Sequence, residues 1–236
     1  MQTKETDKSK ILERNFSTVR LSIQEACNAN QRPLSEVQLL AASKRTDANG
    51  VQLAYEMGHR LFGENRAQSL RDKHDALQDI CPEIEWHFIG HLQKNKVKYI
   101  VGRATTLQSL DSLDLAQALQ NKIKSTPNVS GIRVMIQVKM GEEQSKTGIP
   151  ESDVLVFCEQ IHNDFPELKL CGLMMIPPLH GEPSDWFQRL HDIALKGREQ
   201  GLPLHELSMG MSGDLQHAIA AGSTMIRVGT ALFRGL

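Results

Sequence analysis

Short apolar runs alternate with amphipathic stretches along almost the whole chain, and this alternation constrains the fold more than any other feature. Eight runs are predicted to be strands: 37–43, 60–63, 85–89, 105–109, 132–139, 169–174, 204–208 and 225–228. Continuously apolar strands are buried on both faces, as in a parallel sheet covered by helices. Eight strand–helix units in 236 residues fit a closed (β/α)₈ TIM barrel. An open, doubly wound α/β sheet is the alternative.

The segment before the first strand is predicted to be a helix over residues 10–29. Its apolar stripe consists of Leu12, Phe16, Val19, Ile23 and Cys27. No linker rich in proline, glycine or serine interrupts the rest of the chain. We therefore expect one domain, residues 1–236, in which residues 1–30 add a helix to the barrel.

Four residues are predicted to mark helix ends between the strands. Asp111 and Ser184 are expected to be N-caps, and Pro150 is expected at an early helical position. Gly222 stands where a helix should end, just before the last strand.

Composition and charge exclude several classes of protein. The formal net charge is -1, so no global field favours nucleic acid or an anionic membrane. The four cysteines form no CxxC pair, and no histidine–carboxylate spacing is typical of a metal site. The amino terminus lacks the apolar core of a signal peptide, and no apolar run could span a membrane. We expect a cytoplasmic protein without a bound metal.

Polar residues follow the strands, where ligands bind in such a barrel. Lys44 follows the first strand in LLAASKRT, and Asn65 follows the second in LFGEN. The last two strands lead into the small-residue loops SMGMSGD and RVGT. Loops at these two places are the usual phosphate site of the fold. Asp214 argues against phosphate by its charge, unless it caps the next helix and faces away.

A lysine on the same face as a phosphate site indicates an aldehyde-bearing phosphate held as a Schiff base. Pyridoxal 5′-phosphate is the first candidate and a sugar phosphate, as in an aldolase, the second. Arg227 favours the first, because a guanidinium can donate a hydrogen bond to a pyridine nitrogen but does not give up its proton.

Several long stretches resemble one family. LLAASKRT, FGENRAQ, EWHFIGHLQKNK, SKTGI, GLMMIPP and LSMGMSGDLQHAIAAGSTMIRVGTALF are similar to the YggS/PROSC family of pyridoxal phosphate homeostasis proteins. The ending departs from the family pattern, with Arg234 between Phe233 and Gly235. The resemblance covers the chain from about residue 37 to its end, and the amino-terminal helix also fits.

The resemblance implies a barrel like the N-terminal domain of alanine racemase. It also implies that Lys44 carries pyridoxal 5′-phosphate. The other cofactor-binding residues that it implies are Asn65 beside the cofactor, Met209 lining the site, Ser212, Gly229 and Thr230 at the phosphate, and Arg227 at the pyridine nitrogen. Members are regarded as carriers or regulators that influence vitamin B6 and amino-acid pools, without established catalytic activity.

The residues themselves favour binding over racemisation. In the alanine racemase comparison, a tyrosine from a second domain serves the other face of the substrate. This chain has no such domain, and its tyrosines, Tyr55 and Tyr99, fall in predicted helices. A missing base of this kind typically costs roughly 10²–10⁴-fold in rate. We expect no catalytic residue, a monomer, and apo-enzymes that depend on the cofactor as possible recipients; a racemase or decarboxylase is the alternative.

Two further residues have a structural and a functional interpretation. His87 is interpreted as an interior histidine whose ring nitrogens are satisfied, and less readily as a neighbour of the cofactor. Lys146 could accept the cofactor as a second amine, although pairing with Glu142 or Glu143 is the simpler interpretation.

Overall fold

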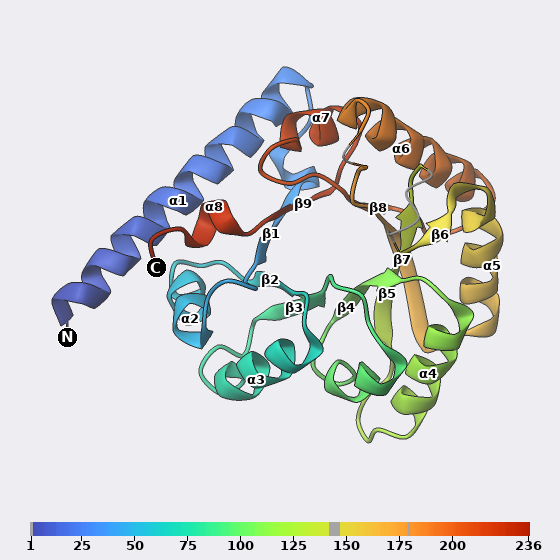
Figure 1. Cartoon of the computed structure of the whole chain (residues 1–236), viewed down its shortest axis with the longest axis horizontal. Helices are drawn as coiled ribbons and strands as arrows, with labels where there is room; N and C mark the ends of the chain where they lie inside the picture. The colour runs from blue at the N-terminus through green and yellow to red at the C-terminus, as the bar shows by residue number, and fades with distance from the viewer. Residues whose placement is uncertain (1, 142–146, 179) are drawn as a thin grey trace.

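Eight parallel strands close into a barrel in the computed structural model, which describes residues 2–141, 147–178 and 180–236. The barrel strands are β1 (Gln38–Ala42), β2 (Leu61–Glu64), β3 (Glu85–Phe88), β4 (Thr106–Leu110), β5 (Ile132–Lys139), β7 (Leu168–Met174), β8 (Glu206–Ser208) and β9 (Met225–Val228). Each strand pairs in parallel with the next, and β9 pairs with β1 (Figure 1). The predicted barrel is confirmed, and the alternative of an open sheet is wrong because the β1–β9 and β4–β5 pairs leave no free edge.

One short strand was not predicted. β6 (Ile149–Pro150) lies outside the barrel and pairs with the end of β5, at Val138 and Lys139. Pro150 therefore does not occupy an early position of the next helix, as the sequence suggested. It precedes a 3₁₀ turn, η3 (Glu151–Asp153), and the helix begins only at Val154.

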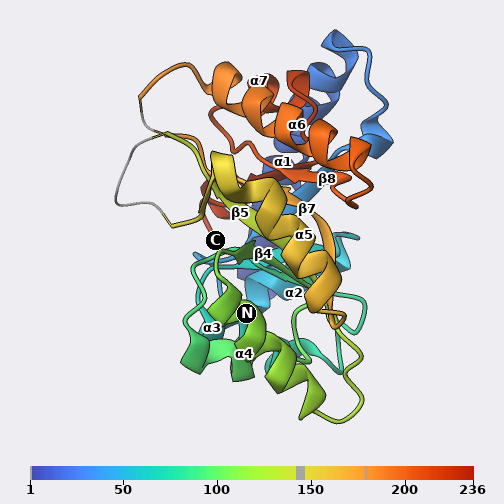
Figure 2. The same cartoon turned by 90° about the vertical axis from the view of Figure 1, so that its right-hand side faces the viewer.

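Helices surround the barrel. They are α1 (Gln2–Ala29), α2 (Ala48–Glu56), α3 (Ala67–Leu77), α4 (Leu113–Lys124), α5 (Val154–Asp164), α6 (Pro183–Glu199), α7 (Leu215–Ala220) and α8 (Thr230–Phe233), with the 3₁₀ turns η1 (Leu34–Glu36) and η2 (Lys94–Tyr99). Figure 2 shows α4, α5 and α6 following one another around the outside. No helix in the described part of the chain has both the length and the apolar character to cross a bilayer.

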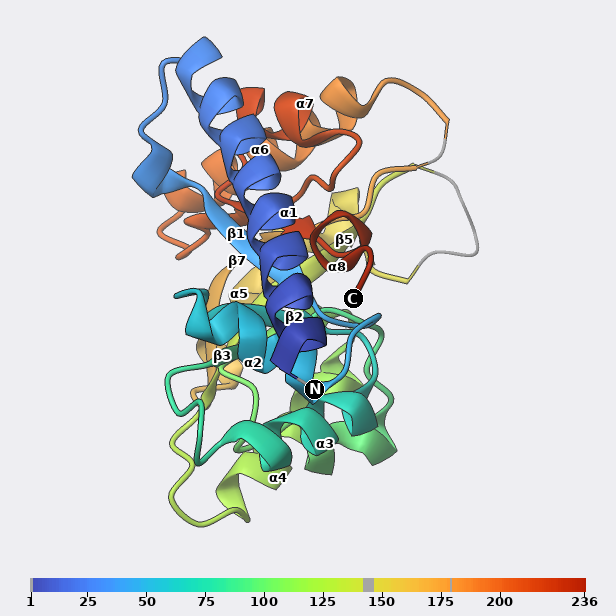
Figure 3. The same cartoon turned by 90° about the vertical axis from the view of Figure 1, so that its left-hand side faces the viewer.

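The amino-terminal helix crosses the outside of the barrel beside α7 and α8 (Figure 3). All five residues of its predicted apolar stripe are buried. The Asn15 side chain donates to the carbonyl oxygens of Leu232 and Arg234, both at 3.0 Å, which holds the end of the chain against α1. The helix begins at Gln2 rather than at residue 10, because its polar first turns favour helix without contributing to an apolar stripe.

Two of the predicted helix caps are wrong. Ser112, not Asp111, is the N-cap of α4, and its hydroxyl accepts from the Leu115 N–H at 3.3 Å. The Asp111 carboxylate instead contacts the His91 ring at 3.3 Å. Ser184 lies inside α6, because Pro183 already has the fixed φ that suits a first helical position. Gly222 ends α7 with a φ of +91°, as expected.

Strand residues alternate between two apolar clusters. Leu40 and Ala42 belong to a small cluster with Met135, Met174 and Met225, whereas Ala41 belongs to the larger cluster under the helices. The small cluster is therefore the inside of the barrel. Polar residues share this interior: His87, Gln108, Ser208 and Arg227 are all buried. A barrel interior with this much polarity is suited to a site rather than to packing alone.

A histidine outside the barrel interior is also buried. The His59 ring lies 5.1 Å from the Phe16 ring and 5.0 Å from the Phe62 ring, and its Nε2 donates to the Leu61 carbonyl at 2.8 Å. Burial is the main cause that lowers its pKa from 6.5 to about 4. The folded protein thus keeps His59 neutral under mildly acidic conditions.

This burial predicts acid sensitivity between about pH 6.5 and pH 4. In that window the unfolded chain binds a proton at His59 that the folded chain does not, so stability falls as the pH falls. In this pH window, the slope of unfolding free energy against pH should be smaller in the His59→Phe variant than in wild type, by about 1.4 kcal/mol per pH unit. Urea unfolding at several pH values measures this slope. An unchanged slope would mean that His59 titrates normally in the folded protein.

Candidate functional site

Lys44 lies at the carboxyl end of β1, in the turn that leads to α2. The Thr46 N–H donates to the Ser43 carbonyl at 3.0 Å and closes this turn. Ser43 is fully buried, whereas Lys44 is exposed. The Asp47 side chain then caps α2 by accepting from the Gly50 N–H at 2.9 Å. The buried strand thus ends in one amine at the mouth of the barrel.

The pairing of β1 with β9 brings the last loop to Lys44. Ala41 is in register with Val228, and a Cβ built on Gly229 would lie 3.1 Å from the Ala42 carbonyl oxygen. Gly229 therefore lies against the end of β1, and the exposed Thr230 begins α8. Two of the predicted phosphate-binding residues and the predicted lysine thus share one edge of the mouth.

The pairing of β1 with β2 brings in Asn65. Ala42 is in register with Gly63, so Lys44 and Asn65 each lie two residues beyond a registered pair. Asn65 is exposed, and its backbone carbonyl oxygen would lie only 2.2 Å from a Cβ at position 90. Glycine at position 90 is what allows the loops after β2 and β3 to approach so closely.

The loop after β8 contains Met209 and Ser212. Ser212 is exposed in the turn before α7, and a Cβ on the neighbouring Gly213 would meet open space. Met209 is fully buried and packs in the larger cluster, so its side chain does not line the mouth. The Asp214 carboxylate accepts from the Met211 N–H at 2.5 Å and so bonds back to its own loop rather than capping α7.

Arg227 lies inside the barrel, on the strand that leads to Gly229. Its Nη1 donates to the carbonyl and hydroxyl oxygens of Ser208, at 2.6 and 2.8 Å, and its Nη2 donates to the Met175 carbonyl at 2.8 Å. Burial lowers its pKa to about 10, and the charge of Asp214 opposes this shift. Among the described residues, only Nε of this guanidinium has no hydrogen-bond partner.

Arg227 sets the direction of a hydrogen-bond chain across the barrel. Because a guanidinium only donates, the Ser208 hydroxyl accepts from it and donates onward to Gln108 Oε1 at 2.6 Å. The Gln108 amide nitrogen then faces His87 Nδ1 at 2.8 Å and Met225 Sδ at 3.0 Å. His87 Nδ1 must therefore accept, which places its proton on Nε2.

His87 is an interior histidine, as predicted, but it is only half satisfied. Its Nε2 is buried and has no partner in the described part of the chain. Burial first, and the charge of Arg133 second, lower its pKa to about 3. The neutral ring agrees with the direction imposed by Arg227. A protonated ring would turn Nδ1 into a donor and break the bond to Gln108.

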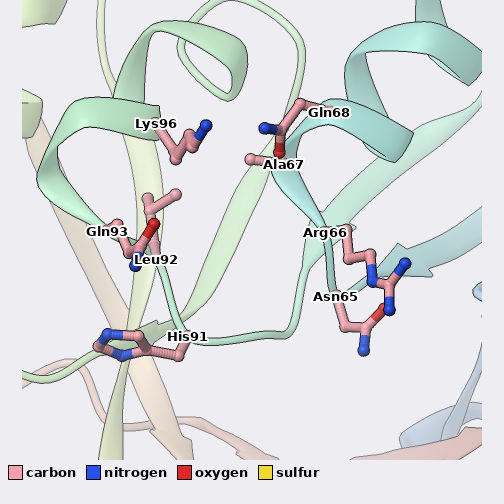
Figure 4. A pocket seen from close by; sticks show the side chains of 8 residues that line it. All are labelled: Asn65, Arg66, Ala67, Gln68, His91, Leu92, Gln93 and Lys96. Atoms are coloured by element: carbon pink, nitrogen blue, oxygen red, sulfur yellow. The ribbon is translucent and has the colours of Figure 1, made fainter.

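A surface pocket of about 220 Å³ lies beside the mouth, between the start of α3 and η2. Its lining residues are Asn65, Arg66, Ala67, Gln68, His91, Leu92, Gln93 and Lys96. Figure 4 shows Lys96 and Gln68 pointing toward one another, whereas the Asn65 and Arg66 side chains extend away from Leu92 and Gln93. Of the predicted site residues only Asn65 lines it, so this pocket is not the place where Lys44 and Arg227 meet.

A buried ion pair contacts Ser43, the residue immediately before Lys44. The Glu64 Oε1 atom accepts from the Lys73 amine at 2.5 Å and from the Ser43 hydroxyl at 2.7 Å. The Lys73 amine also donates to the Ser43 carbonyl at 2.7 Å. The other carboxylate oxygen of Glu64 is buried without a partner among the described residues.

Sequence reasoning did not find several of these residues. Gln108 could have been identified from the sequence, because it is a polar residue inside a predicted strand. Ser208 could have been identified as well, because it begins the stretch SMGMSGD. Nothing in the sequence distinguishes Lys73, since a lysine on an amphipathic helix is usually exposed. Lys146, considered as a second amine, lies outside the described residues.

The arrangement combines an exposed amine, two loops with exposed hydroxyl groups and a buried fixed cation. Such a mouth suits an aldehyde that also carries an anionic group and a hydrogen-bond acceptor. In the described part of the chain, no three His, Cys, Asp or Glu side chains are grouped to hold a metal ion.

Comparisons with known proteins show the fold and the family of the chain. The sequence profile of the alanine racemase N-terminal domain matches residues 23–236. The pyridoxal phosphate homeostasis protein of Aquifex aeolicus is 37% identical over 229 residues, which cover 95% of each chain. The structure of PipY from Synechococcus elongatus with pyridoxal phosphate bound has a TM-score of 0.80 at 33% identity, covering 94% of this chain and 99% of PipY.

A more distant structure is informative for the fold alone. Alanine racemase from Corynebacterium glutamicum has a TM-score of 0.68 at 18% identity, and the match covers 97% of this chain but 62% of the racemase. The barrel described above is therefore the architecture of the racemase N-terminal domain, and the racemase extends beyond it.

The hydrogen-bond chain predicts which serine matters for stability. Ser208→Ala removes an acceptor from Arg227 and a donor from Gln108, both buried, and should destabilise the fold by roughly 1–3 kcal/mol. The matched control Ser212→Ala, at an exposed position of the same loop, should stay within about 0.5 kcal/mol of wild type. Urea unfolding compares the two. Equal effects would contradict the chain as described.

Proposed function

The chain belongs to the pyridoxal phosphate homeostasis protein family, and on this basis we propose that it binds pyridoxal 5′-phosphate on Lys44. In this proposal it serves intracellular supply of the cofactor and amino-acid balance rather than catalysis. The observation that carries the proposal is the β1–β9 pairing, which brings Gly229 against Ala42, two residues before Lys44, with Arg227 in β9.

The Lys44 amine supplies the covalent attachment. Its nitrogen adds to the aldehyde carbon of the cofactor, and loss of one water leaves a Schiff base. Lys44 is exposed, so an incoming ligand reaches the amine without opening the fold. The linkage is hydrolysed by the reverse reaction, which suits a protein that holds the cofactor and then releases it.

The loops after β8 and β9 are suited to the phosphate. Gly229 and Gly213 carry no side chains that would block an approaching anion, and Ser212 and Thr230 offer exposed hydroxyl donors. Asp214 opposes an anion less than its charge suggests, because its carboxylate is bonded to the Met211 N–H.

Arg227 is suited to the pyridine nitrogen. Both N–H groups of its Nη1 donate to Ser208, and one N–H of its Nη2 donates to Met175, which leaves the Nε N–H and the second Nη2 N–H as donors for a ligand. A guanidinium keeps its proton even with a lowered pKa, so it would leave the ring nitrogen unprotonated. Such a ring is a poorer electron sink, which fits storage better than amino-acid chemistry.

The two remaining predicted residues take lesser roles. Asn65 follows the end of β2, the strand paired with β1, and would contact the cofactor from the side. Met209 can contribute only its backbone, since its side chain packs in the larger cluster.

The positions of the tyrosines support binding over racemisation. Tyr55 lies in α2 with its hydroxyl on Glu83 at 3.1 Å, and Tyr99 ends η2. Neither follows a strand into the mouth, so neither is placed as a second base opposite Lys44. The name shared by the curated relatives describes homeostasis and no reaction. Apo-enzymes that need the cofactor are the proposed recipients, and one chain suffices for the site.

The proposal predicts a coloured protein whose colour depends on one lysine. Full-length protein incubated with pyridoxal 5′-phosphate should gain a visible absorption band, and borohydride reduction should fix the adduct on the peptide that contains Lys44. Lys44→Ala should abolish both signals. Lys98→Ala, at an exposed lysine on η2, should leave both unchanged.

Other outcomes would identify other functions. A colourless protein that traps a sugar phosphate on Lys44 would indicate a Schiff-base aldolase instead. Rapid exchange of the α-proton of an amino acid with deuterated solvent would indicate an enzyme. An adduct on another lysine would contradict the site itself.

A further inference from the structure

Lys44 depends on its backbone for its position. It is exposed and makes no side-chain hydrogen bond in the described part of the chain. Ser43, immediately before it, is held at three points. Its N–H donates to the Gly63 carbonyl at 2.9 Å, its hydroxyl donates to Glu64, and its carbonyl accepts from Lys73.

We propose that Glu64 and Lys73 are positioning residues that fix the turn carrying Lys44 and thereby set how readily its amine reacts with an aldehyde. This inference rests on the proposed function of Lys44. The pair does not itself contact the ligand: it acts through Ser43.

The geometry of the pair supports this role. Lys73 projects from α3, yet its side chain is only 11% exposed, and that of Glu64 is 1% exposed. Its amine lies 2.5 Å from Glu64 Oε1 and 2.7 Å from the Ser43 carbonyl, so one cation joins the end of β2 to the end of β1. A lysine that only solubilised α3 would extend into water.

The carboxylate is bonded on one side only. Glu64 Oε1 receives both Lys73 and Ser43, whereas Oε2 is buried and has no partner in the described part of the chain. A buried carboxylate with an unused oxygen costs stability. This carboxylate nevertheless bonds Ser43, the residue immediately before Lys44. We infer that Glu64 positions the backbone there rather than stabilising the fold.

Freedom at Ser43 would be transmitted to Lys44. The Ser43 carbonyl also accepts from the Thr46 N–H, so losing Lys73 would leave this turn with one bond in place of two. The amine would then sample more positions relative to a ligand held by Gly229 and Thr230. Misplacement of a reacting group by about 1 Å can cost about 10²-fold in rate.

The test separates positioning from stability. Removing one partner leaves an uncompensated buried charge, so Lys73→Met or Glu64→Gln alone should lower the Tm. The double variant Glu64→Gln, Lys73→Met removes both charges and should recover much of that loss. The exposed pair of Lys94 with Asp114, 2.7 Å apart, offers the matched control Lys94→Met.

The readout is the rate at which apo-protein forms the borohydride-trapped adduct on Lys44 with pyridoxal 5′-phosphate, measured beside the Tm. The double variant should be folded and at least about tenfold slower than wild type, and Lys94→Met should stay within about twofold. Lys73→Arg keeps the charge, and its guanidinium can donate to both Ser43 and Glu64, so it should restore at least part of the rate lost in the double variant. Ser43→Ala removes only the hydroxyl that bonds Glu64 and should also be slower than wild type.

Two results would overturn the inference. One is a folded double variant that modifies Lys44 at the wild-type rate. The other, decisive if the double variant does not fold, is a wild-type rate in Ser43→Ala, which lacks the hydroxyl link to Glu64. Failure of the wild-type protein to form any adduct on Lys44 would instead refute the proposed function. Adduct formation in wild type and variants alike would refute only the role of the pair.

Discussion

The pairing of β9 with β1 is the constraint on which the site depends. It closes the barrel, and through the register of Ala41 with Val228 it places the end of the chain beside Lys44. An amine near the start of the sequence and a glycine–threonine loop near its end thus become neighbours. The Asn15 side chain strengthens the closure by holding α8 against α1 through two carbonyl oxygens. The amino-terminal helix is therefore part of what keeps the mouth assembled.

A hydrogen-bond chain that starts at Arg227 orders the inside of the barrel. Arg227 is a buried cation whose Nη atoms bond carbonyl and hydroxyl oxygens, and no carboxylate among the described residues contacts it. From it, donors and acceptors run in one direction through Ser208 and Gln108 to a neutral His87. The barrel thus supplies a fixed donor beneath the mouth, and the Glu64–Lys73 pair orders the backbone at its edge.

Sequence alone predicted features that depend on local periodicity and on strand ends. The eight barrel strands and the buried stripe of α1 follow from apolar spacing, and so do the positions of Lys44 and Asn65 just beyond the ends of β1 and β2. Their contact with a ligand stays a prediction from the rule that ligands bind beyond the strands. The first residues of helices were harder to predict. Asp111 and Ser112 are equally good N-cap residues, and only the three-dimensional course of the backbone makes Ser112 the N-cap. The Lys73–Glu64 pair was not predictable, since its partners meet only when α3 packs beside the ends of β1 and β2.

The proposed site requires that one ligand contact Lys44, Arg227 and the Gly229–Thr230 loop at the same time. The most direct measurement is a crystal structure of the protein after borohydride reduction with pyridoxal 5′-phosphate. We expect continuous density from Lys44 Nζ to the ligand, with the phosphate at Ser212, Gly229 and Thr230 and the ring nitrogen facing Arg227. A ligand bound through Lys44 but directed into the pocket between α3 and η2 would show that Arg227 and the Gly229–Thr230 loop do not form the site.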